Sequence, residues 1–303
     1  MNNWKGKYHQ LAIQSQFLML FLLLIISFIA CYVVGMIPIF FSNSTDLSAI
    51  NAQNVGSFKW LQSWSSIGVF ILPSILFVYL TESKFVISKS FSRNQLAISI
   101  CAMLFCIPII NYLALWNEAI HLPQFLSGIE DWMRAYETKS AVIMEYFLCM
   151  DTYSDLFINL FVIALIPAIG EEFLFRGVIQ RGLNKWKNNP HFGIWISAFL
   201  FSALHMQFLG FVPRFLIGGF FGYLFLWCGS IWLPVIAHFI NNALAVVLIF
   251  TSTRNVGTNQ LESLGATSED GTLVLMCCFA LAMLLYLLYE IRATKKILSQ
   301  ERI

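Results

Sequence analysis

The sequence predicts an all-α integral membrane protein, a polytopic bundle of about eight transmembrane helices with both termini cytoplasmic. Two observations predict the class. Of the 303 residues, 58% are hydrophobic and 11% are charged, and the mean hydropathy is +0.73. A soluble domain is typically about 25% charged. The apolar residues also form long uninterrupted runs, and about 20 such residues span a bilayer core as a helix.

Eight apolar runs give the candidate spans. They lie near Phe17–Phe41, Ile67–Tyr79, Ala97–Trp116, Leu156–Phe175, Phe192–Phe208, Pro213–Cys228, Ile231–Phe250 and Thr272–Tyr289. The first is longer than a signal-peptide core and no cleavage site follows it, so we interpret it as a retained helix. The second is short and contains Pro73. The Gly229-Ser230 connection predicts antiparallel neighbours on either side of it.

The charges between the runs predict the orientation. Placing the N-terminus inside puts most basic residues in inner segments: Lys5, Lys7, Lys84, Lys89, Arg93, Arg181, Lys185, Lys187, Arg292, Lys295, Lys296 and Arg302. The outer segments hold fewer: Lys59, Arg134, Lys139, Arg214 and Arg254. This asymmetry follows the positive-inside rule and predicts an even number of spans.

Composition also excludes several classes of function. The net charge of +2 and the lack of a basic tract argue against a nucleic-acid partner. The seven cysteines show no C-x-x-C spacing, so neither a disulfide framework nor a structural zinc site is predicted.

In the outer segment from about 117 to 155, Ala141–Met150 reads as an interfacial helix. Gly218, Gly219 and Gly222 have the small-residue spacing that lets membrane helices approach closely.

Glu171 and Glu172 are adjacent at the end of an apolar run. A charged residue at membrane depth costs about 2.5 kcal/mol or more, and such residues usually mark a functional site. Glu172 and Arg176 are four apart and share a helix face, which predicts an ion pair. Glu171 lies about 100° around the helix and would be free for chemistry. The alternative is an ion-pair network at a helix end, with Arg176 in the inner headgroup zone.

Two later apolar runs carry histidines. Phe201 precedes His205 by one turn, and His238 precedes Asn242 by one turn. His238 and Asn242 could direct hydrogen-bond donors at one point, as an oxyanion hole requires. Asn241 lies on a different face of the helix, and we interpret it as a polar contact between helices. A lone histidine on an apolar helix is also commonly a structural residue, and that alternative stays open for His205.

Together these residues resemble the three motifs of the CPBP family, the type II CAAX prenyl proteases and their bacterial relatives, often called bacteriocin-processing or Abi proteins. The motifs are Glu171-Glu172-x-x-x-Arg176, Phe201-x-x-x-His205 and His238-x-x-x-Asn242, in that order. The resemblance covers about 156–250. It divides the chain into N-terminal helices with the outer loop (1–153), a CPBP-like catalytic core (154–252), and a last helix with a cytoplasmic tail (253–303).

The resemblance implies an intramembrane endopeptidase that hydrolyses a peptide bond with a glutamate-activated water. Glu171 would be the general base, assisted by His205. Glu172 and Arg176 would support it, and His238 with Asn242 would stabilise the oxyanion. No cofactor is expected. The alternative is zinc held by Glu171, His205 and His238, although the H-E-x-x-H signature is absent.

The expected partners are the lipid bilayer and a peptide or membrane-protein substrate, in peptide maturation or bacteriocin self-immunity. A bacterial chain would lie in the cytoplasmic membrane. Two competing functions are an inactive binding or regulatory protein and a proton-relaying transporter, which would show inverted repeats.

One question concerns depth: counting places Glu171 near the inner face and His205 near the outer face. Either the fourth span continues past Arg176, or the fifth is offset.

Overall fold

The computed structural model describes residues 4–41, 50–51, 53–81, 91–252, 264–265 and 267–300. Within them the chain is helical and contains no strand. The basic residues Lys84, Lys89, Arg254 and Arg302, used above to predict orientation, lie outside these ranges, as do the side chains of Lys295 and Lys296.

The elements follow one another as a series of helices. They are α1 Ile13–Gly35, α2 Ile37–Phe41, α3 Val55–Ser66, η1 Ile67–Ile71, α4 Leu72–Thr81, α5 Arg93–Glu118, η3 Gln124–Leu126, α6 Ser127–Leu148, α7 Tyr153–Asn159, η4 Leu160–Leu165, α8 Ile166–Glu172, η5 Phe173–Gln180, α9 Arg181–Lys187, α10 Pro190–Leu204, α11 Phe211–Cys228, α12 Trp232–Ser252, η6 Ser268–Asp270 and α13 Gly271–Gln300. The elements η1, η4 and η5 are π-helical, whereas η3 and η6 are 3₁₀ turns.

Seven helices in the described residues are long and apolar enough to cross a membrane. They comprise residues 13–41, 55–81, 93–118, 153–187, 211–228, 232–252 and 271–294. The all-α, multi-pass prediction is therefore confirmed.

The fifth predicted span, Phe192–Phe208, is wrong in its extent. It is the 15-residue helix α10, Pro190–Leu204, about 22 Å long at 1.5 Å per residue, which is short of the bilayer core of about 30 Å. The helix ends here because Met206 adopts a left-handed conformation with φ of 53°. His205 therefore need not lie at the outer face.

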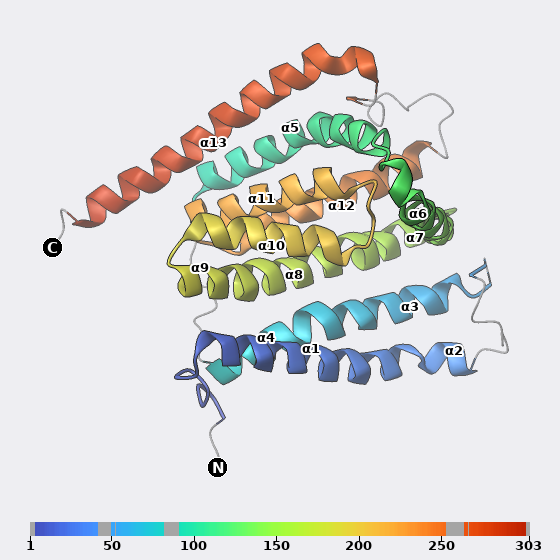
Figure 1. The fold of residues 1–303 in the computed structure, drawn as a ribbon, viewed down its shortest axis with the longest axis horizontal. Coiled ribbons are helices and arrows are strands. Elements are labelled where there is room, and N and C mark those ends of the chain that lie inside the picture. The colour runs from blue at the N-terminus through green and yellow to red at the C-terminus, as the bar shows by residue number, and fades with distance from the viewer. Residues whose placement is uncertain are drawn as a thin grey trace.

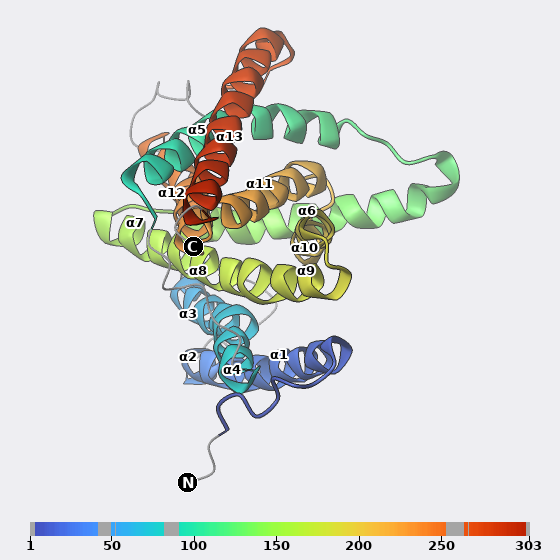
Figure 2. The same ribbon diagram turned by 90° about the vertical axis from the view of Figure 1, so that its left-hand side faces the viewer.

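The helices form three layers. Figure 1 shows α1 to α4 on one side, α7 to α12 in the middle, and α5 with α13 on the other side. Figure 2 shows the same order from the end of the bundle. The start of α1 and the end of α13 lie at the same end of the bundle (Figure 1). Which end faces the cytoplasm remains a prediction.

A close seam joins α10 and α11 at the predicted glycines. A β-carbon at Gly219 would lie 2.7 Å from the Trp195 ring, and one at Gly222 would lie 2.8 Å from Ile194. Neither helix could approach this closely with a larger residue at these positions. The predicted packing role of the glycines is confirmed.

The segment predicted to lie outside contains α6, which is much longer than the predicted helix Ala141–Met150. α6 contacts the connection between α10 and α11. Glu137 Oε1 accepts a hydrogen bond from the Leu209 backbone N–H at 2.5 Å, and the Trp132 ring packs on Phe208 with centroids 5.5 Å apart. The connection that follows His205 is therefore held by α6.

Candidate active site

The two glutamates lie near the middle of the 35-residue helix Tyr153–Lys187. This helix continues past Arg176, as the first of the two depth alternatives requires. The glutamates end α8, a seven-residue α-helical segment with the π-helical η4 and η5 on either side. π-Helical turns are rare and occur frequently at functional sites. Together with the early end of α10, the long helix brings Glu171 and His205 to one depth.

Glu172 is held by two hydrogen bonds. Its Oε1 accepts from Arg176 at 3.0 Å and from His238 Nδ1 at 2.9 Å. The Glu172 and Arg176 side chains are fully buried. The ion pair predicted from their i, i+4 spacing is present.

Arg176 is further held by α11. Its second terminal nitrogen donates to the Gly218 carbonyl at 2.7 Å. The guanidinium carbon lies 4.9 Å from the centroid of the Phe201 ring and 5.5 Å from that of Phe221. Aromatic faces attract a cation, so these rings compensate part of the hydration that Arg176 loses.

Gln180 repeats this contact one turn further on, and the sequence reasoning missed it. Its Nε2 donates to the Gly222 carbonyl at 3.1 Å, parallel to the Arg176–Gly218 bond. Gln180 is buried. The available signal was the i, i+4 spacing of Glu172, Arg176 and Gln180, which places all three on one helix face.

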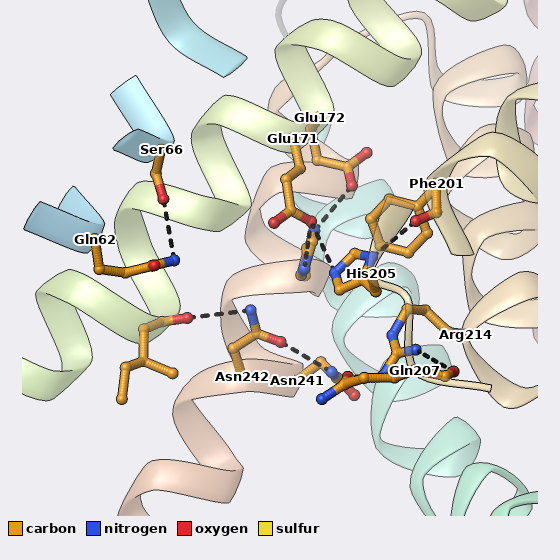
Figure 3. A network of polar contacts seen from close by, with 12 residues as sticks. Gln62, Ser66, Glu171, Glu172, Phe201, His205, Gln207, Arg214, Asn241 and Asn242 are labelled. Carbon is orange, nitrogen blue, oxygen red and sulfur yellow. Dashed lines mark hydrogen bonds and ion pairs between the residues drawn. The ribbon is translucent and has the colours of Figure 1, made fainter. Parts of the chain in front are cut away.

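Glu171 is held differently. Its Oε2 lies 3.9 Å from His205 Nε2 and 3.9 Å from His238 Nε2, and it has no hydrogen-bond partner among the described residues. A separation of 3.9 Å is too long for a hydrogen bond. Figure 3 shows the carboxylate of Glu171 directed toward the His205 ring and away from Glu172.

The hydrogen-bond partners assign the tautomers of both rings. His205 Nδ1 lies 2.7 Å from the Phe201 carbonyl, which can only accept. His238 Nδ1 faces the carboxylate of Glu172. Both Nδ1 atoms therefore carry hydrogen, and in a neutral ring the Nε2 atom is then an acceptor. Three acceptor atoms thus surround one point: Glu171 Oε2, His205 Nε2 and His238 Nε2.

The predicted convergence of donors from His238 and Asn242 is not present in this arrangement. Asn242 Nδ2 donates to the Ile163 carbonyl in η4 at 3.4 Å. Asn242 Oδ1 accepts from Asn241 Nδ2 at 3.1 Å, so Asn241 is a partner of Asn242 (Figure 3). The spacing of four residues correctly placed His238 and Asn242 on α12. It could not predict that the Asn242 side chain bonds to Ile163 and Asn241.

The same three acceptors would be the ligands of the zinc alternative. Both rings donate Nδ1–H to an oxygen, as metal-bound histidines usually do. Two ligand atoms on tetrahedral zinc lie about 3.3 Å apart, which is less than the 3.9 Å from Glu171 Oε2 to each ring. Accordingly, no group of three His, Cys, Asp or Glu in the described part of the chain is arranged to hold a metal ion.

Arg214 also lies near the site, and the sequence reasoning assigned it only to an outer segment. It lies in the first turn of α11 and donates to Gln207 Oε1 at 2.7 Å. It is close enough to Glu171 and His205 to interact with both electrostatically, and Figure 3 shows it beside His205. Its proximity depends on the α10–α11 connection, which spacing along one helix cannot reveal.

Comparison with known proteins bears on this same segment. Residues 153–244 match the family described as type II CAAX prenyl endopeptidase, Rce1-like. Residues 153–244, referred to below as the Rce1-like domain, are thus similar to that family. The match begins at α7 and includes all six predicted site residues, in line with the resemblance drawn from the motifs.

One curated relative is an uncharacterized protein, YpbD, of Bacillus subtilis (strain 168). It is 33% identical over 89 residues, which are 28% of this chain and 42% of YpbD. The match therefore spans less than half of that relative's length. No solved structure matches. The Rce1-like domain and the apolar helices identify an integral multi-pass membrane protein.

Proposed function

We propose that this chain is an intramembrane endopeptidase of the CAAX-protease type, in which Glu171 is the general base. One observation carries the proposal. Glu171 is buried beside two imidazoles without a hydrogen bond, whereas Oε1 of the adjacent Glu172 accepts hydrogen bonds from both Arg176 and His238. The Rce1-like domain around these residues supports it.

A water molecule fits the chemistry of this point. Its two hydrogens can be donated to two of the three acceptors, and its oxygen is then free to attack a peptide carbonyl. Glu171 would take one proton as the carbon–oxygen bond forms. The protonated Glu171 would then give that proton to the leaving amine as the carbon–nitrogen bond breaks, either directly or with His205 as a proton relay.

The oxyanion needs donors that the resting arrangement directs elsewhere. Asn242 would turn from the Ile163 carbonyl toward the oxyanion. His238 donates through Nε2 only when both ring nitrogens carry hydrogen. Glu172, itself held by Arg176, would position the His238 ring through Nδ1. Catalytic hydrogen bonds commonly tighten only once substrate is bound.

The test is cleavage of a membrane-peptide library by the detergent-purified full chain. Wild type is compared with Glu171→Ala and with Glu145→Ala, an exposed glutamate of α6, each with and without a zinc chelator. We expect cleavage by wild type and Glu145→Ala, insensitive to chelator, and none by Glu171→Ala. Equal cleavage by Glu171→Ala would overturn the proposal.

The alternatives give different outcomes of the same test. Chelator-sensitive cleavage would assign Glu171, His205 and His238 as zinc ligands. If neither wild type nor Glu145→Ala cleaves any peptide, while Glu171→Ala retains the biological effect of the protein, the chain is a binding or regulatory protein. The substrate class proposed here is a peptide or membrane protein, and prenylation of the substrate is a variable for the library.

A further inference from the structure

The connection between α10 and α11, residues 205–210, is held by a side chain of α5, which lies outside the Rce1-like domain. Asn117 is buried in the last turn of α5. Its Oδ1 accepts a hydrogen bond from the Val212 backbone N–H at 2.9 Å, and its Nδ2 donates to the Phe208 carbonyl at 3.0 Å. One partner can only donate and the other can only accept, so they assign the orientation of the amide. Asn117 thus holds the chain at two points four residues apart.

Two further side chains bind the same stretch of backbone. Ser202 Oγ in α10 donates to the Phe211 carbonyl at 2.7 Å, and Glu137 Oε1 in α6 accepts from the Leu209 N–H. Together with the two bonds of Asn117, these contacts bind four backbone groups at the end of the connection and the start of α11. Helices α5, α6 and α10 therefore determine the path of this short segment together.

This path includes an unfavourable backbone conformation at Met206. Its φ is 53°, in the left-handed region that residues with a β-carbon rarely adopt. The Met206 side chain is exposed, so its own packing is a weak restraint on the backbone. A conformation of this kind persists where the surrounding contacts determine it. Here those contacts are the hydrogen bonds from Asn117, Ser202 and Glu137.

The way α10 ends determines which group binds the His205 ring. The His205 N–H donates to the Ser202 carbonyl, three residues back, at 3.3 Å. In a continuing α-helix it would donate to the Phe201 carbonyl, four residues back. That carbonyl instead accepts from His205 Nδ1 at 2.7 Å. The bond places hydrogen on Nδ1 and leaves Nε2 as an acceptor toward Glu171, so the helix end and the tautomer of the ring are linked.

We propose that Asn117 is a positioning residue that acts through His205, because it holds the connection in the path that the left-handed Met206 requires. The inference rests on the function proposed above, in which His205 assists Glu171. It extends the functional machinery to α5, outside the matched residues 153–244. Without Asn117, Met206 would relax toward helical backbone, and the His205 N–H would compete with the ring for its carbonyl partner.

The first test is steady-state cleavage by the detergent-purified full chain, with a membrane peptide from the library described above. We expect Asn117→Ala to lower kcat about 10- to 10²-fold, the loss that a small displacement of a catalytic group causes, and to leave KM nearly unchanged. The matched control is Asn111→Ala, which removes a hydrogen bond from the same helix to the Leu264 carbonyl and should keep the kcat of wild type. An equal loss of kcat in the two variants would overturn the proposal.

Met206→Gly separates positioning from a merely structural role. Glycine adopts a positive φ without the cost that other residues bear. Added to Asn117→Ala, this change should raise kcat at least about fivefold, which corresponds to about 1 kcal/mol. A double variant no more active than Asn117→Ala would contradict the link through Met206. If Asn117→Ala does not fold, Met206→Val decides, because a β-branched residue at positive φ is strongly disfavoured. Its kcat should lie below that of Met206→Gly, and equal values would overturn the proposal.

A second measurement needs no substrate and keeps this inference apart from the proposed function. Diethyl pyrocarbonate modifies the unprotonated nitrogen of an imidazole, so mass spectrometry of His205 in the resting protein reports how its ring is held. We expect several-fold faster modification of His205 in Asn117→Ala than in wild type or Asn111→Ala. Equal rates in all three would overturn the inference. Wild type that cleaves no peptide, or Glu171→Ala that still cleaves, would overturn only the proposed function, and the modification rates then decide whether Asn117 positions the ring.

Discussion

The two sides of the candidate site differ in how their polar groups are satisfied. On the supporting side, which we define as Glu172, Arg176 and Gln180, each side chain is bonded to a neighbour or to a carbonyl of α11. On the reactive side, Glu171 faces two histidines at distances too long for hydrogen bonds. Adjacent residues of one helix thus have opposite surroundings.

This difference separates stability from chemistry. A buried ion pair is strongly destabilised when one partner is removed, because the other charge loses its compensation. A buried carboxylate without hydrogen bonds contributes nothing of that kind to folding, and its burial itself costs free energy. The supporting side should therefore determine whether the bundle folds, and the reactive side whether it reacts.

The largest expected effect is that neutralising Glu172 lowers stability, whereas neutralising Glu171 abolishes activity without lowering stability. Glu172→Gln should lower the free energy of unfolding by about 3–5 kcal/mol, because it leaves Arg176 buried without its counter-charge. Glu171→Gln should leave stability unchanged or raise it, while abolishing activity. Thermal unfolding in detergent measures both, and a Glu171→Gln variant as unstable as Glu172→Gln would contradict the division.

The next effect concerns the reactive side alone. Asn242→Ala should reduce turnover about 10²- to 10³-fold, the usual loss of one oxyanion donor. Substrate affinity should change little, since the donor acts on the transition state. Steady-state cleavage kinetics check this, with Asn241→Ala as the neighbouring control. A comparable loss in Asn241→Ala would mean that the pair acts structurally.

A smaller effect should come from the seam that supports Arg176. In Gly218→Ala the new methyl group would lie 3.2 Å from Ala198 Cβ and from the Phe201 ring. Overpacking of this kind typically costs about 1–3 kcal/mol. Gly128→Ala is the control, because no atom lies within 4 Å of its added β-carbon. Similar melting temperatures for the two variants would show that the seam can relax.

The smallest effect lies at the surface of α6. Three hydrogen bonds, from the Leu122 N–H, Arg134 and His121, hold the pKa of Glu130 at about 2, below its ordinary 4.5. Stability from this contact is therefore fully present above about pH 4.5 and is lost as pH falls through about 2. Glu130→Gln should remove that acid dependence. Thermal unfolding from pH 6 to pH 2 measures it, and identical pH profiles would show that the contact is not linked to stability.

The sequence predicted those parts of the structure that repeat along one helix. The Glu172–Arg176 pair and the glycine seam follow from i, i+4 spacing, and the membrane helices follow from apolar runs. Their recognition needs no knowledge of the partner helix. The resemblance of the three motifs to the CAAX proteases likewise agrees with the Rce1-like match over 153–244.

What the sequence could not predict depends on contacts between helices. Met206 ends α10 early through a left-handed backbone, and no apolar count detects this. Asn242 bonds to a π-helical carbonyl, and Arg214 reaches the site through the connection after His205. Each outcome is decided by the relative position of two helices, which the spacing within either one does not contain.

The paired bonds from Arg176 and Gln180 to Gly218 and Gly222 have a mechanical consequence. If α11 slid one turn along η5, about 5.4 Å, Arg176 would meet Gly222 and Gln180 would meet Leu226. The β-carbon of leucine would hold the backbones apart there, so the second bond could not form again. The seam therefore resists sliding in that direction, because only one of its two bonds could form again.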